Sequence, residues 1–207
     1  MSASPIVGVL AIQGDVREHS NKLQESGAIV RAVKHPGELA GISGLVIPGG
    51  ESTTMSILAA NNNLFEPLRE LSKNIPMYGS CAGLIMLADE VTDGRSDQQT
   101  IGGLNITAAR NAFGRQRDSF EIDLEIQALG PPKFHAIFIR APLVTQIGND
   151  VEVLATISDS VSLGEAKAQD ERIVAVRQGN LLATSFHPEL TSDLRFHQYF
   201  VEMVKLA

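Results

Sequence analysis

The strongest constraint on the fold is an alternation, in the first half of the chain, between short apolar runs and segments with helical periodicity. Residues 6–12 form a near-continuous apolar run, which is typical of a strand buried on both faces of a sheet. Residues 16–26 have a helical pattern, with Asp15 available as the N-terminal cap and Gly27 as the end. Because this alternation continues to residue 88, we expect an α/β fold whose central sheet is mostly parallel and flanked by helices.

The same patterns give the bounds of the other elements. In the first half we expect strands at residues 29–33, 44–47 and 76–78, and helices at 53–60, 64–73 and 84–88. The second half contains strand patterns at 100–107, 119–126, 134–139, 151–157, 173–176 and 182–186, some of them in an antiparallel extension, and a final helix at 192–206. Residues 158–171 are polar and rich in small side chains, so we expect a surface loop there. We expect residues 1–207 to form one domain, because this length suffices for one core and is short for two.

Charge and cysteine content exclude several classes of function. The formal net charge is −7 and no basic run offsets it, which argues against nucleic acid as a partner. The chain has one cysteine, so it cannot form an intrachain disulfide. No apolar run reaches membrane-spanning length, and no basic residue precedes the short apolar stretch near the N-terminus. We therefore expect a cytoplasmic protein without a membrane partner.

The single cysteine lies at the junction of a strand pattern and a helix pattern. Residues 79–83, Gly-Ser-Cys-Ala-Gly, have the Gly-x-Cys-x-Gly form that is the thiol counterpart of a nucleophile elbow. Its glycines permit a sharp turn that strains the central residue, and the N-terminus of the following helix favours a thiolate. The pattern indicates a catalytic nucleophile at Cys81. A buried structural cysteine is the alternative.

The candidate base closes a strand pattern near the end of the chain. His187 and Glu189 flank a proline, and in an extended segment residues i and i+2 point the same way. Glu189 can then hold the imidazole in the tautomer that accepts a proton from Cys81, as in a catalytic triad. The alternatives are a histidine that caps a strand end and half of a metal site. We find no third ligand at a suitable spacing, so we expect no metal.

Other segments are candidates for binding a substrate. Residues 48–54, Pro-Gly-Gly-Glu-Ser-Thr-Thr, follow a buried strand, so their amides can approach a ligand and Ser52 or Thr53 can cap the next helix. A tight turn with a helix cap is the alternative, and a phosphate loop is excluded because its lysine pattern is absent. Arginines within residues 110–116 and 138–142 can clamp a carboxylate, although a solvated surface arginine is equally compatible with each pattern.

Taken together, these segments resemble the class I, triad-type glutamine amidotransferases, and more narrowly the glutaminase subunits of two-component pyridoxal 5′-phosphate synthases. The cysteine and His-Pro-Glu motifs are typical of the wider superfamily, whereas Gly-Gly-Glu-Ser-Thr-Thr and Arg-Asn-x-Phe-Gly-Arg-Gln favour the vitamin B6 branch. Two departures are a longer segment at residues 158–171 and Ser80 in place of the commoner threonine. The matching segments span nearly the whole chain in order: residues 8–19, 48–54, 81–83, 110–116, 118–121, 138–142 and 184–191.

The resemblance implies a fold and a set of roles. The fold is a mostly parallel sheet flanked by helices, with the nucleophile at a strand-to-helix elbow. Cys81 attacks the side-chain amide of L-glutamine, His187 shuttles the proton and Glu189 orients His187. The amides of Gly50 and Ala82 hold the oxyanion, and no cofactor is implied. The residues implied to bind L-glutamine are Gly50, Glu51, Ser52, Arg110, Ile139 and Arg140.

The resemblance also implies a partner, the synthase subunit of a heteromeric complex. Ammonia released into neutral water is mostly protonated and no longer nucleophilic, so useful transfer needs a channel that excludes water. Family members are generally poorly active until docked. Docking is thought to rearrange the Gly49–Gly50 peptide, with the turn at Gln13 and Gly14 near the contact.

Three other interpretations differ in what the site does. A glutaminase that feeds a different biosynthetic synthase would use the same chemistry. A cysteine peptidase or a redox-stress protein can also carry an elbow on an α/β scaffold, but it needs a peptide groove or an acidic residue close to the thiol. A regulatory subunit that kept only the fold would not require Cys81, His187 and Glu189 together.

Overall fold

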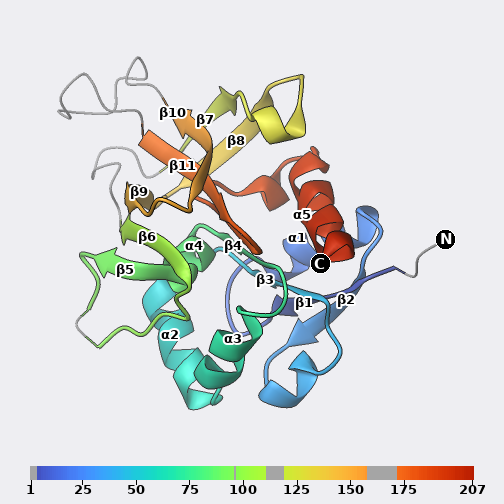
Figure 1. Cartoon of the computed structure of the whole chain (residues 1–207), viewed down its shortest axis with the longest axis vertical. Helices are drawn as coiled ribbons and strands as arrows, with labels where there is room; N and C mark the ends of the chain where they lie inside the picture. The colour runs from blue at the N-terminus through green and yellow to red at the C-terminus, as the bar shows by residue number, and fades with distance from the viewer. Residues whose placement is uncertain (1–3, 96, 111–118, 158–171) are drawn as a thin grey trace.

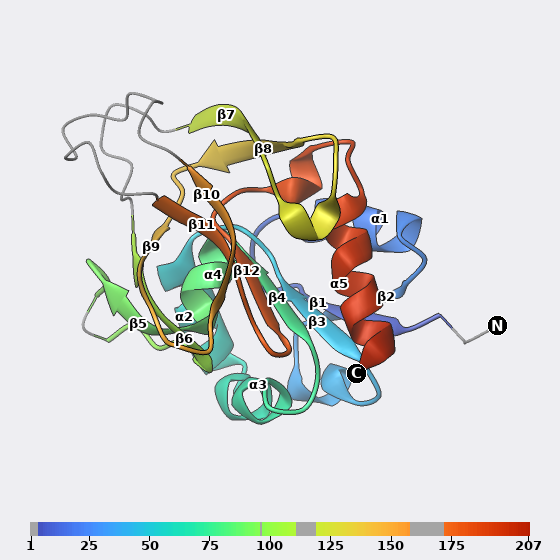
Figure 2. The ribbon, with the colours of Figure 1, turned by 45° about the horizontal axis from the view of Figure 1, so that its top comes forward.

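A computed structural model describes residues 4–95, 97–110, 119–157 and 172–207. Among these residues the main feature is a ten-stranded sheet in which nine strands follow the order β2-β1-β3-β4-β12-β11-β9-β6-β5 and β10 pairs with β11. The labels in Figure 1 and Figure 2 locate these strands. A separate antiparallel hairpin is formed by β7 (Ser119–Leu124) and β8 (Phe134–Ile139), at the top of Figure 2.

One half of the sheet is parallel, as the alternating pattern predicts. Its strands pair in parallel from β2 through β1, β3 and β4 to β12. Because β12 comes from the end of the chain, it brings the His-Pro-Glu segment beside the strand that precedes the cysteine. The bounds of these strands are β1 Ile6–Leu10, β2 Ile29–Val33, β3 Gly44–Ile47, β4 Met77–Ser80 and β12 Leu181–Thr184.

The other half is largely antiparallel, as expected for an extension built from the second half of the chain. β11 pairs antiparallel with β12, β9 and β10, and β6 pairs antiparallel with β9. At the far edge β5 and β6 are parallel. The bounds are β5 Ala88–Thr92, β6 Leu104–Ala109, β9 Leu143–Ile147, β10 Glu152–Ile157 and β11 Arg172–Gln178.

Helices cover both faces of the parallel half, because its strands are apolar on both sides. Along β3, the side chain of Val46 joins one core cluster, while Leu45 and Ile47 join the other. The first cluster includes residues of α1 and α5, and the second includes residues of α2, α3 and α4. The helices are α1 Val16–Glu25, α2 Ser52–Asn61, α3 Phe65–Leu71, α4 Ala82–Leu87 and α5 Arg195–Leu206.

The structure corrects several expected element bounds. The strands β5 and β9 were not expected from the sequence, and α4 begins at Ala82, directly after the cysteine, instead of at residue 84. The expected surface loop at residues 158–171 lies outside the described residues. No helix in the described part of the chain is long and apolar enough to cross a membrane.

Candidate active site

Cys81 occupies the strained turn that the glycine pattern predicts. It connects β4 to α4 with φ 49° and ψ −103°, a backbone conformation that residues with a side chain rarely adopt. A Cβ atom at Gly79 would overlap the backbone of Gly83, and one at Gly83 would overlap the carbonyl oxygen of Ile47. The two glycines therefore let the strand, the turn and the helix approach closely enough to form the elbow.

The thiol of Cys81 is almost buried, with 6% of the residue exposed. The backbone N–H of Cys81 donates to the carbonyl of Thr184, 2.8 Å away, which links the elbow to the end of β12. Its Sγ atom donates to the carbonyl oxygen of Ile139 at 3.7 Å. Ile139 is the last residue of strand β8, so the end of this strand lies beside the Cys81 thiol, and Arg140 follows it with φ 45°.

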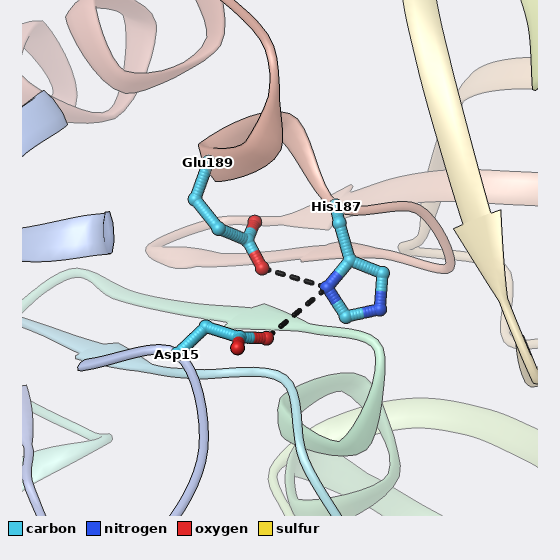
Figure 3. Close-up of side chains that lie close together, drawn as sticks. All are labelled: Asp15, His187 and Glu189. Atoms are coloured by element: carbon cyan, nitrogen blue, oxygen red, sulfur yellow. Dashed lines mark hydrogen bonds and ion pairs between the residues drawn. The ribbon is translucent and has the colours of Figure 1, made fainter. Parts of the chain in front are cut away.

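His187 and Glu189 are in direct contact. Nδ1 of His187 lies 2.7 Å from Oε1 of Glu189, and both residues are buried (Figure 3). The expected reason for this contact was wrong, because the segment is not extended: Pro188–Leu190 form a 3-10 helix directly after His187. A proline at the start of this turn is favourable since it has no N–H to leave unpaired.

Asp15 places a second carboxylate on the same imidazole nitrogen. Oδ2 of Asp15 lies 3.5 Å from Nδ1 of His187, from the turn that precedes α1 (Figure 3). Asp15 occupies the N-cap position of α1, as expected, but its side chain makes no capping hydrogen bond. Asp15, His187 and Glu189 offer ligand atoms within 4.8 Å of one another. Because the 2.7 Å contact is a hydrogen-bond distance between two of these atoms, we interpret the group as acid–base rather than metal-binding.

The electrostatic surroundings favour a protonated His187. Burial acts to lower its pKa, but the neighbouring side chains of Asp15, Cys81 and Glu189 outweigh burial and raise the pKa to about 12. Burial in turn raises the pKa of Glu189, against the lowering effect of His187. Since Nδ1 faces the two carboxylates, Nε2 is the nitrogen left for exchange with the thiol. It is buried and has no hydrogen-bond partner among the described residues.

The Gly49–Gly50 peptide lies against the imidazole. The carbonyl of Gly49 accepts a hydrogen bond of 3.2 Å from the N–H of Asp15, which fixes the orientation of this peptide. A Cβ atom at Gly49 would overlap the ring of His187, and one at Gly50 would overlap the side chain of Gln13. Gln13 also accepts a 2.9 Å hydrogen bond from the N–H of Glu51. The turn before α1 therefore holds the candidate oxyanion loop in place.

The side chain of Arg110, the residue after β6, reaches the start of α2, where three side chains bind it. Its guanidinium donates to Glu51 at 3.0 Å, Thr53 at 3.1 Å and Gln98 at 3.2 Å. Glu51, and not Ser52 or Thr53 as expected, caps α2 through the N–H groups of Thr53 and residue 54. The fixed fork of an arginine suits such multiple contacts and leaves a cation beside the N-terminus of α2.

Among the predicted site residues, the structure brings Ile139 to Cys81, Glu189 to His187 and Arg110 to Glu51. Ser52 is the buried first residue of α2, and Ala82 is the first residue of α4. The part of the predicted segment 110–116 that follows Arg110 lies outside the described residues. Two neighbours of the candidate triad were not expected there: Asp15, which the sequence suggested only as a helix cap, and His19, which lies one helical turn further along α1.

Comparison with known proteins identifies the family. Residues 9–206 match the SNO glutamine amidotransferase family. The chain belongs to this family. Its relatives include the protein named "Pyridoxal 5′-phosphate synthase subunit PdxT" from Clavibacter michiganensis, which is 54% identical over 98% of this chain and 92% of the relative. The protein of the same name from Salinispora arenicola is 54% identical over 99% of this chain and 98% of the relative.

Solved structures agree with this assignment to the SNO family. A crystal structure described as a glutamine amidotransferase superposes with a TM-score of 0.84 and 44% identity, covering 96% of this chain and 98% of that one. The PurLQS structure from Thermotoga maritima superposes with a TM-score of 0.67 but 16% identity, covering 99% of each chain, so it shows a shared fold alone. The predicted family and the predicted α/β fold are thus both confirmed.

Proposed function

We propose that this chain is the glutaminase subunit of a pyridoxal 5′-phosphate synthase, hydrolysing L-glutamine to L-glutamate and ammonia at Cys81. The observation that carries the proposal is the buried 2.7 Å contact between His187 and Glu189 beside a cysteine at a strained elbow. Membership of the SNO glutamine amidotransferase family and relatives named as synthase subunits support the substrate and the pathway.

In the first half-reaction the thiolate of Cys81 attacks the side-chain carbonyl carbon of glutamine. A protonated His187 next to the thiol favours this thiolate, and Glu189 stabilises the positive charge on the imidazole. The amides of Gly50 and Ala82 are the proposed donors to the oxyanion of the tetrahedral intermediate. Its collapse breaks the C–N bond, His187 gives its proton to the leaving nitrogen, and ammonia departs from a thioester on Cys81.

In the second half-reaction water attacks the thioester. The now neutral His187 takes a proton from this water, and the C–S bond breaks to release L-glutamate and regenerate the thiolate. Glu51, Ser52, Arg110, Ile139 and Arg140, with Gly50, are the proposed binding residues for the substrate. Among them Arg110 can pair with the α-carboxylate of glutamine, since its guanidinium is already oriented by three acceptors.

The proposed partner is the synthase subunit, which receives the ammonia in a heteromeric complex within the cytoplasm. Transfer by direct contact explains why the chain would work as a subunit, because free ammonia in neutral water is mostly protonated. We propose that residues 1–207 form a single glutaminase domain. A synthase of a different pathway is the alternative, but both of the relatives described above, each 54% identical, carry the pyridoxal 5′-phosphate synthase name.

The geometry of the nucleophile supports activation by docking. Sγ of Cys81 donates to the carbonyl of Ile139, whereas Nε2 of His187 makes no hydrogen bond within the described residues. A rotation of the thiol toward Nε2 would be needed before attack. The Gly49 carbonyl is likewise held by Asp15, so reorientation of the Gly49–Gly50 peptide would break that hydrogen bond. A partner that contacts the turn before α1 could supply both changes.

The test is glutamate release from L-glutamine by the purified chain, alone and with the synthase subunit. Turnover that rises steeply with the synthase and vanishes in Cys81→Ala would establish both the chemistry and the partner. Full turnover by the free chain would overturn the docking requirement but keep the chemistry. No release in either condition, with both proteins folded, would overturn the proposed function for this partner.

A further inference from the structure

His19, a buried histidine outside the proposed triad, contacts the carboxylate oxygen of Glu189 that faces away from His187. Nε2 of His19, on α1, lies 3.3 Å from Oε2 of Glu189, the oxygen that does not face His187. The same nitrogen lies 3.0 Å from Oγ of Ser80, the residue directly before the nucleophile. On its other side, Nδ1 of His19 lies 3.0 Å from Nε2 of His197 on α5. His19 thus joins Glu189, the nucleophile strand and the last helix.

The burial of this group restricts the protonation states open to it. His19, Ser80 and His197 are fully buried, and burial lowers the pKa of both histidines, that of His197 to about 3. Both rings are therefore neutral near neutral pH, and each carries one N–H. His197 has an unpaired Nδ1 among the described residues, which costs less when it is an acceptor than when it is an N–H donor.

One arrangement of these protons suits a negatively charged Glu189 better than the other. If His197 carries its proton on Nε2, it donates to Nδ1 of His19, and the proton of His19 is on Nε2, facing Ser80 and Glu189. In the opposite tautomer a lone pair of His19 would face the carboxylate oxygen at 3.3 Å, which is repulsive. The 3.3 Å approach is off the line of a hydrogen bond, so Ser80 is the acceptor and the Glu189 contact is a dipole–charge contact.

We propose that His19 is a positioning residue for glutamine hydrolysis: its Nε2–H holds the carboxylate of Glu189 toward His187 and ties it to Ser80 beside the nucleophile. This inference rests on the proposed function in so far as Glu189 orients the catalytic base. Glu189 is buried, and a buried carboxylate with one partner for two oxygens tends to take up a proton or turn away. With the N–H of His19 facing its second oxygen, Glu189 stays ionised and keeps one orientation.

Among the described residues, no cation takes the place of His19 next to Oε2 of Glu189. Facing Glu189 are His187 and Asp15, and the ring of Tyr78 lies against His19 at 5.9 Å between centroids. Asp15 is negative, so it raises the pKa of Glu189 instead of holding the charge. Lys22, one helical turn beyond His19 on α1, acts on His197. Within the described residues His19 therefore supplies the N–H dipole that faces Oε2, an atom with no hydrogen-bond partner there.

The test compares His19→Leu and His19→Gln with a matched control. Leucine removes both ring nitrogens, whereas the amide N–H of glutamine can reach toward the position of Nε2. Leu23→Ala is the control, since Leu23 lies one turn along the same helix, is fully buried and has no side-chain N–H. With the synthase subunit present, we expect His19→Leu to lower kcat for glutamate release about 10- to 100-fold, with little change in KM. His19→Gln should recover most of this loss.

A second readout does not depend on glutaminase activity. Nitrogen-15 NMR of the imidazole rings reports the protonation of His187, whose signals are assigned with His187→Gln. We expect His187 to remain an imidazolium over the pH range in which the wild-type chain and Leu23→Ala are folded. In His19→Leu it should lose its proton within that range, because the carboxylate that stabilises the proton is less firmly held.

Each outcome decides between positioning and a purely structural role. A shift in the His187 ring together with the kcat loss and its rescue by glutamine would support the proposal. Turnover and ring state in His19→Leu that match Leu23→Ala would overturn it, and so would a kcat loss without any change at His187. If the wild-type chain releases no glutamate with the synthase, the proposed function fails, while the NMR comparison still tests the hold on Glu189.

Discussion

Asp15 and His187 form a contact that joins the turn before α1 to the candidate catalytic motif near the end of the chain. Oδ2 of Asp15 lies 3.5 Å from Nδ1 of His187, the atom that Glu189 approaches at 2.7 Å. The two carboxylates differ in their surroundings, because the side chain of Asp15 is 37% exposed and that of Glu189 is fully buried. Water screens the charge of Asp15, so Glu189 should provide most of the orientation of the imidazole.

We therefore predict unequal effects when each carboxylate is replaced by its amide. Glu189→Gln should reduce kcat for glutamate release by about 10²- to 10⁴-fold, because an amide can no longer select the correct tautomer. Asp15→Asn should cost about tenfold or less, since Glu189 remains in place. Both are measured with the synthase subunit at saturation. Equal losses in the two variants would contradict this division of roles.

The strain at Cys81 predicts an inverted order of stability between glycine and alanine. Glycine ordinarily destabilises a folded chain by about 0.5–1 kcal/mol relative to alanine. At a φ of 49° a residue with a Cβ is strained by about 1–3 kcal/mol, so Cys81→Gly should be more stable than Cys81→Ala by about 1 kcal/mol. Urea unfolding of the two inactive variants measures this difference. Ala82→Gly, one residue into α4, is the control and should destabilise the chain; the ordinary order at position 81 would mean that the elbow is unstrained.

Arg110 should contribute mainly to substrate binding. Its guanidinium bridges Glu51, Thr53 and Gln98, which a lysine ammonium cannot do with the same geometry. We expect Arg110→Lys to raise KM for glutamine about tenfold with a smaller change in kcat, as for loss of binding shared by substrate and transition state. Arg69→Lys is the matched control, because Arg69 is a half-buried arginine of α3 that pairs with Glu66 instead of Glu51. An unchanged KM would remove Arg110 from the proposed glutamine site.

The buried histidine pair predicts that acid destabilises the fold. Burial, assisted by the charge of Lys22, lowers the pKa of His197 from its ordinary 6.5 to about 3. Between these values the unfolded chain binds a proton at this site and the folded chain does not. The stabilising contribution is therefore present above pH 6.5 and is lost as the pH falls toward 3, by about 1.4 kcal/mol per pH unit.

His197→Gln tests this sign, because glutamine can donate to His19 but does not titrate. The free energy of unfolding, measured in urea from pH 7 down to pH 4.5, should fall less steeply in the variant than in the wild type. His135→Gln is the control: His135 is exposed, its neighbours Asp123 and Glu121 raise its pKa, and its loss should not flatten the acid slope. Identical slopes in wild type and His197→Gln would show that His197 is not neutral in the fold.

Local sequence patterns were sufficient to predict those parts of the candidate site whose residues lie within a few positions of each other in the chain. The spacing of glycines around Cys81 predicted the elbow, and the approach of Gly79 to Gly83 confirms the steric reason. The two-residue spacing of His187 and Glu189 predicted their contact correctly, although the chain makes it through a 3-10 turn instead of a strand. In both cases the relevant geometry is set by torsion angles of consecutive residues.

The sequence patterns did not predict strands β5 and β9, because neither strand has a clear pattern of its own. The burial of β5 alternates poorly, since its middle residues are exposed at the edge of the sheet. β9 is short and mostly exposed, and it becomes a strand because β6 and β11 pair with it on either side. Hydrogen bonding to neighbours that are distant in sequence determines such strands more than their own side chains do.

By itself, the sequence determined the α/β class, the elbow at Cys81 and the pairing of His187 with Glu189, because each depends on local periodicity or spacing. Only the tertiary structure decided which further groups surround that pair. Asp15 reaches His187 and His19 reaches Glu189 because β12, from the end of the chain, lies beside β4, with α1 and α5 on the same face of the sheet. The sequence around a polar helix residue is the same whether its side chain caps the helix, faces water or faces a buried carboxylate. That distinction arises when folding removes the water between residues 178 positions apart, as for His19 and His197.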